Sequence, residues 1–221
     1  MTLQAVLFDL DGTLLDTAPD LANALNRLRE DRGQTALTQA AVRKVVSNGA
    51  NAMLTLAFQQ SPGDPDFEEL RAQLLAYYLE NLASHTRPFE GIERLIEQLH
   101  AAGIAWGVVT NKPWPYTQPL MMQFSFASPP AVIICPEHVS HRKPAPDALL
   151  LACEQLQCEV NRAIYVGDHQ RDILCGKHAG MDTIAVGYGY IDDNDSHLNW
   201  GAEHSVTKAE EIWPIIEAYL P

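Results

Sequence analysis

Pairs of acidic residues follow two short apolar runs of the sequence. Asp9 and Asp11 come directly after residues 4–8, and Asp168 and Asp172 come after a second such run. Carboxylates this close in the chain repel one another unless a cation or a shared proton relieves the repulsion. A set of oxygen ligands without clustered Cys or His suits a hard ion, and Mg²⁺ fits it best. The spacing therefore predicts a magnesium site.

Hydrogen-bond donors and a cation follow two further apolar runs. Thr110 and Asn111 come after residues 104–109, and Lys143 lies beyond residues 131–134. A lysine binds a phosphate oxygen as a point charge, and the hydroxyl and amide groups supply further donors. Each feature is weak alone, since a lone Asp-x-Asp-Gly usually only caps a strand at a turn. The ordered set, one member at the end of each run, indicates phosphate chemistry.

The elements that must position these residues alternate along the chain. Five continuous apolar runs predict buried strands at 4–8, 104–109, 131–134, 163–166 and 183–186. Continuous rather than alternating apolar character is typical of parallel strands covered on both faces. Helical spacing of apolar residues lies between or after them, at 91–102, 146–157, 171–179 and 208–219. We therefore expect an open α/β sheet, with the ligand beyond the carboxyl ends of its strands.

One region departs from this alternation. Between the first and second strands the sequence contains no strand pattern but helical patterns, near 20–31, 38–46, 51–59 and 67–83. We expect an all-helical cap domain over residues 17–86, and a catalytic core formed by residues 1–16 and 87–221. A plain crossover connection of roughly 70 residues is the less favoured alternative, because structureless connections of that length are uncommon.

Composition excludes several classes of protein. Of the 221 residues, 47% are hydrophobic and 19% are charged, which is typical of a globular protein and not of a disordered or fibrous one. The formal charge of −13 repels polyanions, so we expect neither nucleic acid nor a membrane as a partner. No basic stretch followed by an apolar run opens the sequence, so we expect a cytoplasmic protein. We expect it to be either a monomer or a homodimer.

The ordered set of motifs resembles the haloacid dehalogenase superfamily of phosphohydrolases. Asp9-Leu10-Asp11-Gly12-Thr13-Leu14-Leu15-Asp16-Thr17 looks like its first motif. Thr110-Asn111 looks like the second, Lys143 like the third, and Gly167-Asp168 with Asp172 like the fourth. The resemblance covers nearly the whole chain, including the helical insert. It implies a Rossmann-like core, Mg²⁺ as cofactor and a small phosphorylated metabolite as substrate.

The resemblance also implies a role for each residue. Asp9 would attack phosphorus and form an aspartyl-phosphate, while Asp11 would protonate the leaving oxygen and then take a proton from water. Mg²⁺ would bind the Asp9 side chain, the Asp11 backbone carbonyl and Asp168, with Asp172 orienting that shell. The groups that stabilise the transferring oxygens would be Thr110, Asn111 and Lys143, and Thr13 is expected among the substrate contacts.

Two resemblances bear on the substrate. Val46-Ser47-Asn48-Gly49-Ala50 looks like the cap loop of phosphoglycolate phosphatases, so Asn48 and Gly49 are candidate substrate contacts. The alternative of equal weight is that they only end a helix. Arg43 is a candidate for a substrate carboxylate, although a solvated helix face is favoured. The segments 106–113, 134–136 and 199–202 look instead like the N-acetylmuramic acid 6-phosphate phosphatases.

Alternative activities stay open within this superfamily. Its dehalogenases lack the second aspartate of the first motif, so Asp11 favours phosphate-ester chemistry. A sugar phosphomutase resembling β-phosphoglucomutase would share the motifs and the helical cap, but would return the phosphoryl group to substrate. A non-catalytic binding module is the third alternative, and it would not need both Asp9 and Asp11.

Overall fold

The computed structural model of the protein describes residues 2–220. The chain forms two compact units, which are described in turn. The first unit is Met1–Leu15 with Pro88–Pro221, and the second is Asp16–Arg87. The chain passes between them at β2 (Leu15–Asp16) and β3 (Arg87–Pro88), which pair as a two-stranded sheet.

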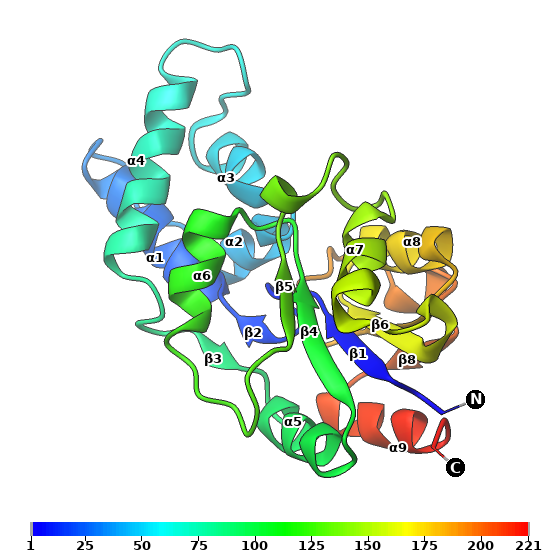
Figure 1. The fold of residues 1–221 in the computed structure, drawn as a ribbon. Coiled ribbons are helices and arrows are strands. Elements are labelled where there is room, and N and C mark those ends of the chain that lie inside the picture. The colour runs from blue at the N-terminus through cyan, green and yellow to red at the C-terminus, as the bar shows by residue number, and fades with distance from the viewer. Residues whose placement is uncertain (1, 221) are drawn as a thin grey trace. The chain divides into compact units, whose positions relative to one another are not determined.

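The first unit contains a six-stranded sheet in the order β5-β4-β1-β6-β7-β8 (Figure 1). Its strands are β1 (Ala5–Phe8), β4 (Ala105–Val109), β5 (Val132–Ile134), β6 (Ala163–Gly167), β7 (Asp182–Val186) and β8 (His204–Val206). All neighbouring pairs are parallel. The predicted α/β fold with a Rossmann-like parallel sheet is confirmed.

The strand order brings the predicted site residues to one place. The chain runs from β1 to β4 and β5 on one side, and then crosses to β6, β7 and β8 on the other. The order therefore reverses beside β1, and in open α/β sheets the crevice at that reversal is where ligands bind. Asp9 follows β1, Thr110 follows β4 and Asp168 follows β6, so all three lie at this reversal.

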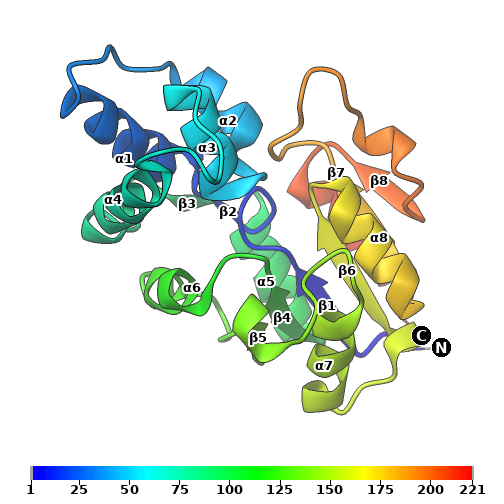
Figure 2. The same cartoon turned by 90° about the horizontal axis from the view of Figure 1, so that it is seen from above.

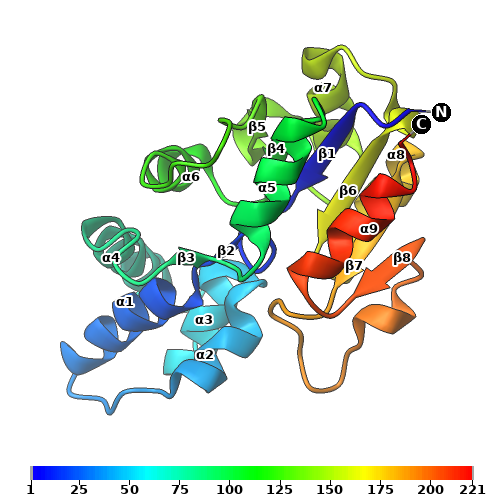
Figure 3. The same ribbon diagram turned by 90° about the horizontal axis from the view of Figure 1, so that it is seen from below.

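Helices cover both faces of the sheet. One face carries α5 (Ile92–Ala101) and α9 (Ile212–Glu217), and the other carries α7 (Asp147–Leu156) and α8 (Gln170–Ala179), as Figures 1 and 3 show. The unit also contains α6 (Trp114–Met121) and short 3₁₀ helices at Pro136–His138, Val160–Arg162, His197–Asn199 and Ala209–Glu211.

Burial explains why the apolar runs form strands. Every residue of β1 and of β6 is buried, as a strand covered on both faces requires. Leu149 and Ala152 of α7 pack in one buried cluster with Leu7, Val109 and Tyr165 of three neighbouring strands. This packing fixes the strand ends, and with them the backbone that carries the candidate site.

The second unit is helical. It contains α1 (Ala18–Glu30), α2 (Gln39–Val46), α3 (Gly49–Phe58) and α4 (Phe67–Glu80), with α1 beside α4 and α2 beside α3 (Figure 2). Asp20 of α1 is buried, and its carboxylate accepts hydrogen bonds from the backbone N–H groups of His85 and Thr86. The start of the unit is thereby tied to its end. That this unit acts as a cap stays a prediction.

The edge strand β8 differs from the other strands of the sheet. Strand β8 has no continuous apolar run and was not predicted, because its three residues include only one buried side chain, that of Val206. Its place in the sheet comes from pairing with β7 rather than from its own apolar pattern.

Over residues 2–220, no helix combines the length and the apolar character that crossing a bilayer requires.

Candidate active site

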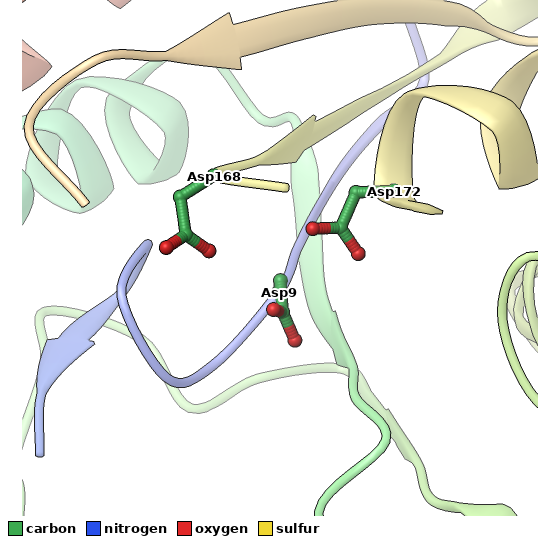
Figure 4. A group of neighbouring side chains, drawn as sticks. All are labelled: Asp9, Asp168 and Asp172. Atoms are coloured by element: carbon green, nitrogen blue, oxygen red, sulfur yellow. The ribbon is translucent and has the colours of Figure 1, made fainter. Parts of the chain in front are cut away.

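Three carboxylates converge at the carboxyl ends of the central strands. Asp9 follows β1, Asp168 follows β6, and Asp172 lies in the first turn of α8. Each offers an oxygen, and these oxygens all lie within 4.8 Å of one another. Figure 4 shows the three side chains as neighbours that come from different parts of the chain. Among the described residues, this is the group of acidic, His or Cys side chains whose geometry suits a metal ion.

Lys143 lies inside this acidic group. Its Nζ is 2.9 Å from Asp9 Oδ1 and 2.7 Å from Asp172 Oδ1, and its side chain is only 1% exposed. It also donates to Tyr165 Oη and to the Val109 carbonyl oxygen. Burial alone would lower the Lys143 pKa, but the charges of Asp172 and Asp9 raise it above its ordinary value. Lys143 is therefore held as a cation.

The carboxylates themselves are held in an environment that disfavours negative charge. Burial raises the pKa of Asp9 from 3.8 to about 6, against the opposing attraction of Lys143. Burial also raises the pKa of Asp168 well above its ordinary value, with Asp9 and Asp172 adding like-charge repulsion. A single lysine thus leaves the group short of positive charge. A divalent cation with oxygen ligands would supply it, so the residues present fit Mg²⁺.

Asp168 is fixed by contacts on both of its oxygens. The Thr13 hydroxyl donates to Oδ1 at 3.2 Å, and the Tyr190 N–H donates to Oδ2 at 2.8 Å. Gly12 and Gly189 allow this approach, since a Cβ on either would lie within 2.5 Å of an Asp168 oxygen. Thr13 was predicted as a substrate contact, but its side chain is buried and its hydroxyl is directed to Asp168.

Asn111 holds the backbone of Lys143. Its amide N–H donates to the Lys143 carbonyl oxygen at 3.2 Å, and its carbonyl oxygen accepts from the Lys143 N–H at 3.1 Å. The loop after β4 is therefore clamped to the segment that carries the lysine. The expected contact of Asn111 with the transferring oxygens stays a prediction. Thr110 is buried beside it, and its hydroxyl accepts from the Lys112 N–H.

Asp11 has a different cationic neighbour from Asp9. Lys112 Nζ lies 2.9 Å from Asp11 Oδ1, and the two side chains are 8% and 19% exposed. The Asp11 carboxylate is not one of the three that converge in the metal-binding geometry. No role was predicted for Lys112, because a lysine after Thr110-Asn111 carries no signal of its own. Only the fold brings it to Asp11.

The predicted residues of the helical insert lie in the second unit. Arg43 of α2 is half-buried, and its Nη1 lies 2.7 Å from Asp16 Oδ1 and 2.8 Å from Oδ2. A solvated helix face was the favoured expectation for Arg43. The structure shows in addition that Arg43 forms an ion pair with Asp16 of the same unit. Asn48 and Gly49 are exposed at the junction of α2 and α3, with Gly49 at a φ of 77°. Their contact with substrate stays a prediction.

His169 and Trp200 have structural partners. His169 caps α8 by accepting from the Arg171 N–H, and its ring stacks on Trp200. Trp200 is buried against Ile173 and Ala185, and its indole N–H donates to Asp195. Burial lowers the pKa of His169 from 6.5 to about 4, so its ring is neutral at pH 7. These contacts favour packing as the role of the Asn199-Trp200-Gly201 segment.

Comparison with known proteins matches the chain to one family. The family model for Haloacid dehalogenase-like hydrolase matches residues 6–186, a range that includes the three carboxylates and Lys143. The chain belongs to the haloacid dehalogenase-like hydrolases. An N-acetylmuramic acid 6-phosphate phosphatase of Pseudomonas aeruginosa is 43% identical over 220 residues, covering 100% of this chain and 97% of that protein.

Further members of the family resemble the chain over most of its length. A phosphoglycolate phosphatase of Xanthomonas campestris pv. campestris is 38% identical over 210 residues, covering 95% of each protein. Among solved structures, a predicted phosphoglycolate phosphatase from Haemophilus somnus superposes with a TM-score of 0.86 at 26% identity. That match covers 97% of this chain and 98% of the other.

Proposed function

We propose that this haloacid dehalogenase-like hydrolase is a Mg²⁺-dependent phosphomonoesterase that acts on a small phosphorylated metabolite. The observation that carries the proposal is the buried contact of Lys143 with Asp9, beside Asp168. It combines a carboxylate nucleophile with the positive charge that a phosphoryl group requires. The second unit is proposed to serve as the cap of this enzyme.

Asp9 begins the reaction as the nucleophile. With a pKa of about 6, its carboxylate is predominantly anionic at pH 7 to 8. One carboxylate oxygen attacks phosphorus, the bond from phosphorus to the ester oxygen breaks, and an aspartyl-phosphate forms. Asp11 enters this step in its protonated form and gives that proton to the departing oxygen, which leaves as an alcohol. Lys143 stabilises negative charge on the transferring phosphoryl oxygens.

Water completes the reaction. Asp11, now a carboxylate, takes a proton from the water that attacks phosphorus. The bond between phosphorus and the Asp9 oxygen breaks, inorganic phosphate leaves, and the Asp9 carboxylate is restored. The Asp11 side chain thus serves as the acid in the first step and as the base in the second.

The magnesium ion would be held by oxygen ligands of the core. The Asp9 and Asp168 carboxylates and the Asp11 backbone carbonyl are the proposed ligands, with Asp172 orienting them through Lys143. When bound, Mg²⁺ supplies a Lewis acid that stabilises charge on the phosphoryl oxygens. Thr13 positions Asp168, and Asn111 positions Lys143.

N-acetylmuramic acid 6-phosphate is the favoured substrate, and 2-phosphoglycolate is the alternative. The favoured assignment is supported by the 43% identity to a phosphatase named for that sugar phosphate, against 38% to one named for phosphoglycolate. The cap residues Asn48 and Gly49 are proposed to contact the leaving group. Arg43 is the weaker candidate, because its guanidinium already pairs with Asp16.

Phosphate release from a panel of esters tests this proposal. The panel contains N-acetylmuramic acid 6-phosphate, 2-phosphoglycolate and hexose phosphates, each with Mg²⁺. Asp9→Asn serves as the inactive variant, and Glu93→Gln, which removes one exposed carboxylate from the same unit, serves as its matched control. We expect turnover by wild type and Glu93→Gln alone. Turnover by Asp9→Asn at the wild-type rate, or none by wild type, would overturn the proposal.

A further inference from the structure

Asp11 and Lys112 form an ion pair apart from the one between Asp9 and Lys143. Their charged atoms, Oδ1 and Nζ, are 2.9 Å apart, although the residues are 101 positions apart in the chain. Both side chains are largely buried. Each of the two aspartates of the first motif therefore has its own lysine, one from the loop after β4 and one from the segment before α7.

The backbone of Lys112 is held on both sides. Its N–H donates to the Thr110 hydroxyl at 3.1 Å, and its carbonyl oxygen accepts from the Thr117 hydroxyl at 3.1 Å. Thr117 lies in α6 and is fully buried. A long lysine side chain loses conformational freedom when it is fixed. With an anchored backbone, Lys112 restricts Asp11 more than a mobile surface lysine would.

An ion pair of this kind contributes orientation more than stability. Exposed pairs stabilise proteins weakly, and removing two charges from water offsets most of the attraction between buried ones. A carboxylate, by contrast, rotates about its Cβ–Cγ bond unless something holds it. Proton transfer to a leaving oxygen depends on that orientation, since the donor and the acceptor must come within hydrogen-bond distance.

We propose that Lys112 is a positioning residue: it holds Asp11 Oδ1 and thereby orients Oδ2, the oxygen that carries the proton in the substrate complex, for proton transfer to the leaving group. The inference rests on the proposed phosphomonoesterase activity, in which Asp11 is the general acid. It assigns Lys112 no contact with the phosphoryl group, whose cationic partner is Lys143. Substitution of Lys112 should therefore lower kcat/KM more for a substrate whose leaving oxygen needs a proton than for one whose leaving oxygen does not.

The test compares two substrates with the same protein sample. A sugar 6-phosphate leaves as an alkoxide and needs a proton, whereas p-nitrophenyl phosphate leaves as a stabilised phenolate and needs little help. The value of kcat/KM reports the steps through formation of the aspartyl-phosphate, and the ratio of the two values does not depend on the fraction of folded protein. The variants are Lys112→Met and Lys112→Arg, with Lys208→Met as a matched control at an exposed lysine of the same unit.

We expect Lys112→Met to lower kcat/KM on the sugar phosphate on the order of 10- to 100-fold, and on p-nitrophenyl phosphate less than about threefold. Lys112→Arg should recover part of the loss, and Lys208→Met should behave as wild type. In an Asp11→Asn background, Lys112→Met should cost no more than about twofold, because the two residues act together.

Two other results would overturn the inference while leaving the proposed function intact. An equal loss on both substrates would mean that Lys112 contacts the phosphoryl group or maintains the site in general. Wild-type values for Lys112→Met on both substrates would mean that the ion pair has no catalytic effect. If wild type hydrolyses neither substrate nor any other ester, the proposed function fails and the inference fails with it.

Discussion

Lys143 Nζ lies 2.9 Å from Asp9 Oδ1, and neither side chain is more than 14% exposed. The same nitrogen lies 2.7 Å from Asp172 Oδ1, so one ammonium group faces two buried carboxylates. The lysine therefore combines a structural contact with a proposed catalytic role. It compensates buried negative charge in the fold, and it is the proposed partner of the phosphoryl oxygens.

Lys143→Met should destabilise the protein as well as inactivate it. Removing the cation leaves the Asp9 and Asp172 carboxylates buried without compensation, which costs about 3 to 5 kcal/mol. Urea unfolding in the presence of EDTA measures this loss. Lys208→Met, at an exposed site, should unfold as wild type does. A Lys143→Met protein of wild-type stability would show that the carboxylates stay protonated or hydrated in the fold.

The stability of the metal-free protein should depend on pH through Asp9. Because the folded-state pKa is about 6 against an ordinary 3.8, the fold binds this proton more tightly than the unfolded chain does. The resulting stabilisation is complete below about pH 4 and is lost as the pH rises through 6. Asp9→Asn carries no such proton. Its stability relative to wild type should therefore rise with pH, by up to about 3 kcal/mol at neutral pH.

Urea unfolding in EDTA at pH 4, 6 and 7.5 measures this difference between Asp9→Asn and wild type. Carboxyl groups far from Asp9 titrate alike in both proteins, so their effects cancel in the comparison. Asp9→Asn also removes the like charge that raises the pKa of Asp168, which adds to the expected rise with pH. Added Mg²⁺ should stabilise wild type more than Asp9→Asn at pH 7.5. Stability curves that run parallel from pH 4 to 7.5 would contradict the raised pKa of Asp9.

Thr13→Val should weaken metal binding without greatly changing the fold. Valine has nearly the shape of threonine but lacks the hydroxyl that donates to Asp168 Oδ1. Loss of such an orienting partner lowers metal affinity about 10-fold or more. Calorimetric titration with MgCl₂ measures the affinity, and Thr13→Ser, which keeps the hydroxyl, is the matched control. Equal affinities for Thr13→Val and wild type would exclude this role.

Asp20→Ala should destabilise the helical unit. The Asp20 carboxylate is 1% exposed and accepts from the backbone N–H groups of His85 and Thr86 and from the Thr86 hydroxyl. Leaving those donors without an acceptor costs about 3 kcal/mol or more. Urea unfolding measures the loss, with Glu69→Gln as a control at an exposed carboxylate of the same unit. A loss below about 0.5 kcal/mol would mean that water replaces the carboxylate.

Local pattern predicted the parallel strands and the placement of the core motifs. A continuous apolar run indicates a strand that is buried on both faces of the sheet. In a parallel sheet the residues that follow such strands all lie at the same edge. The sequence was therefore sufficient to place Asp9, Thr110 and Asp168 together. The short strand β8 could not be predicted in this way, because a run with one buried residue carries no periodic signal.

Strand burial and motif order are properties of neighbouring residues, so they were enough to predict which side chains reach the edge of the sheet. How those side chains pair follows only from the packed fold. It directs Asn111 to the Lys143 backbone, Thr13 to Asp168 and Lys112 to Asp11. Hydrogen bonds and ion pairs depend on distances of about 3 Å between residues far apart in the chain, and only the packed fold sets those distances.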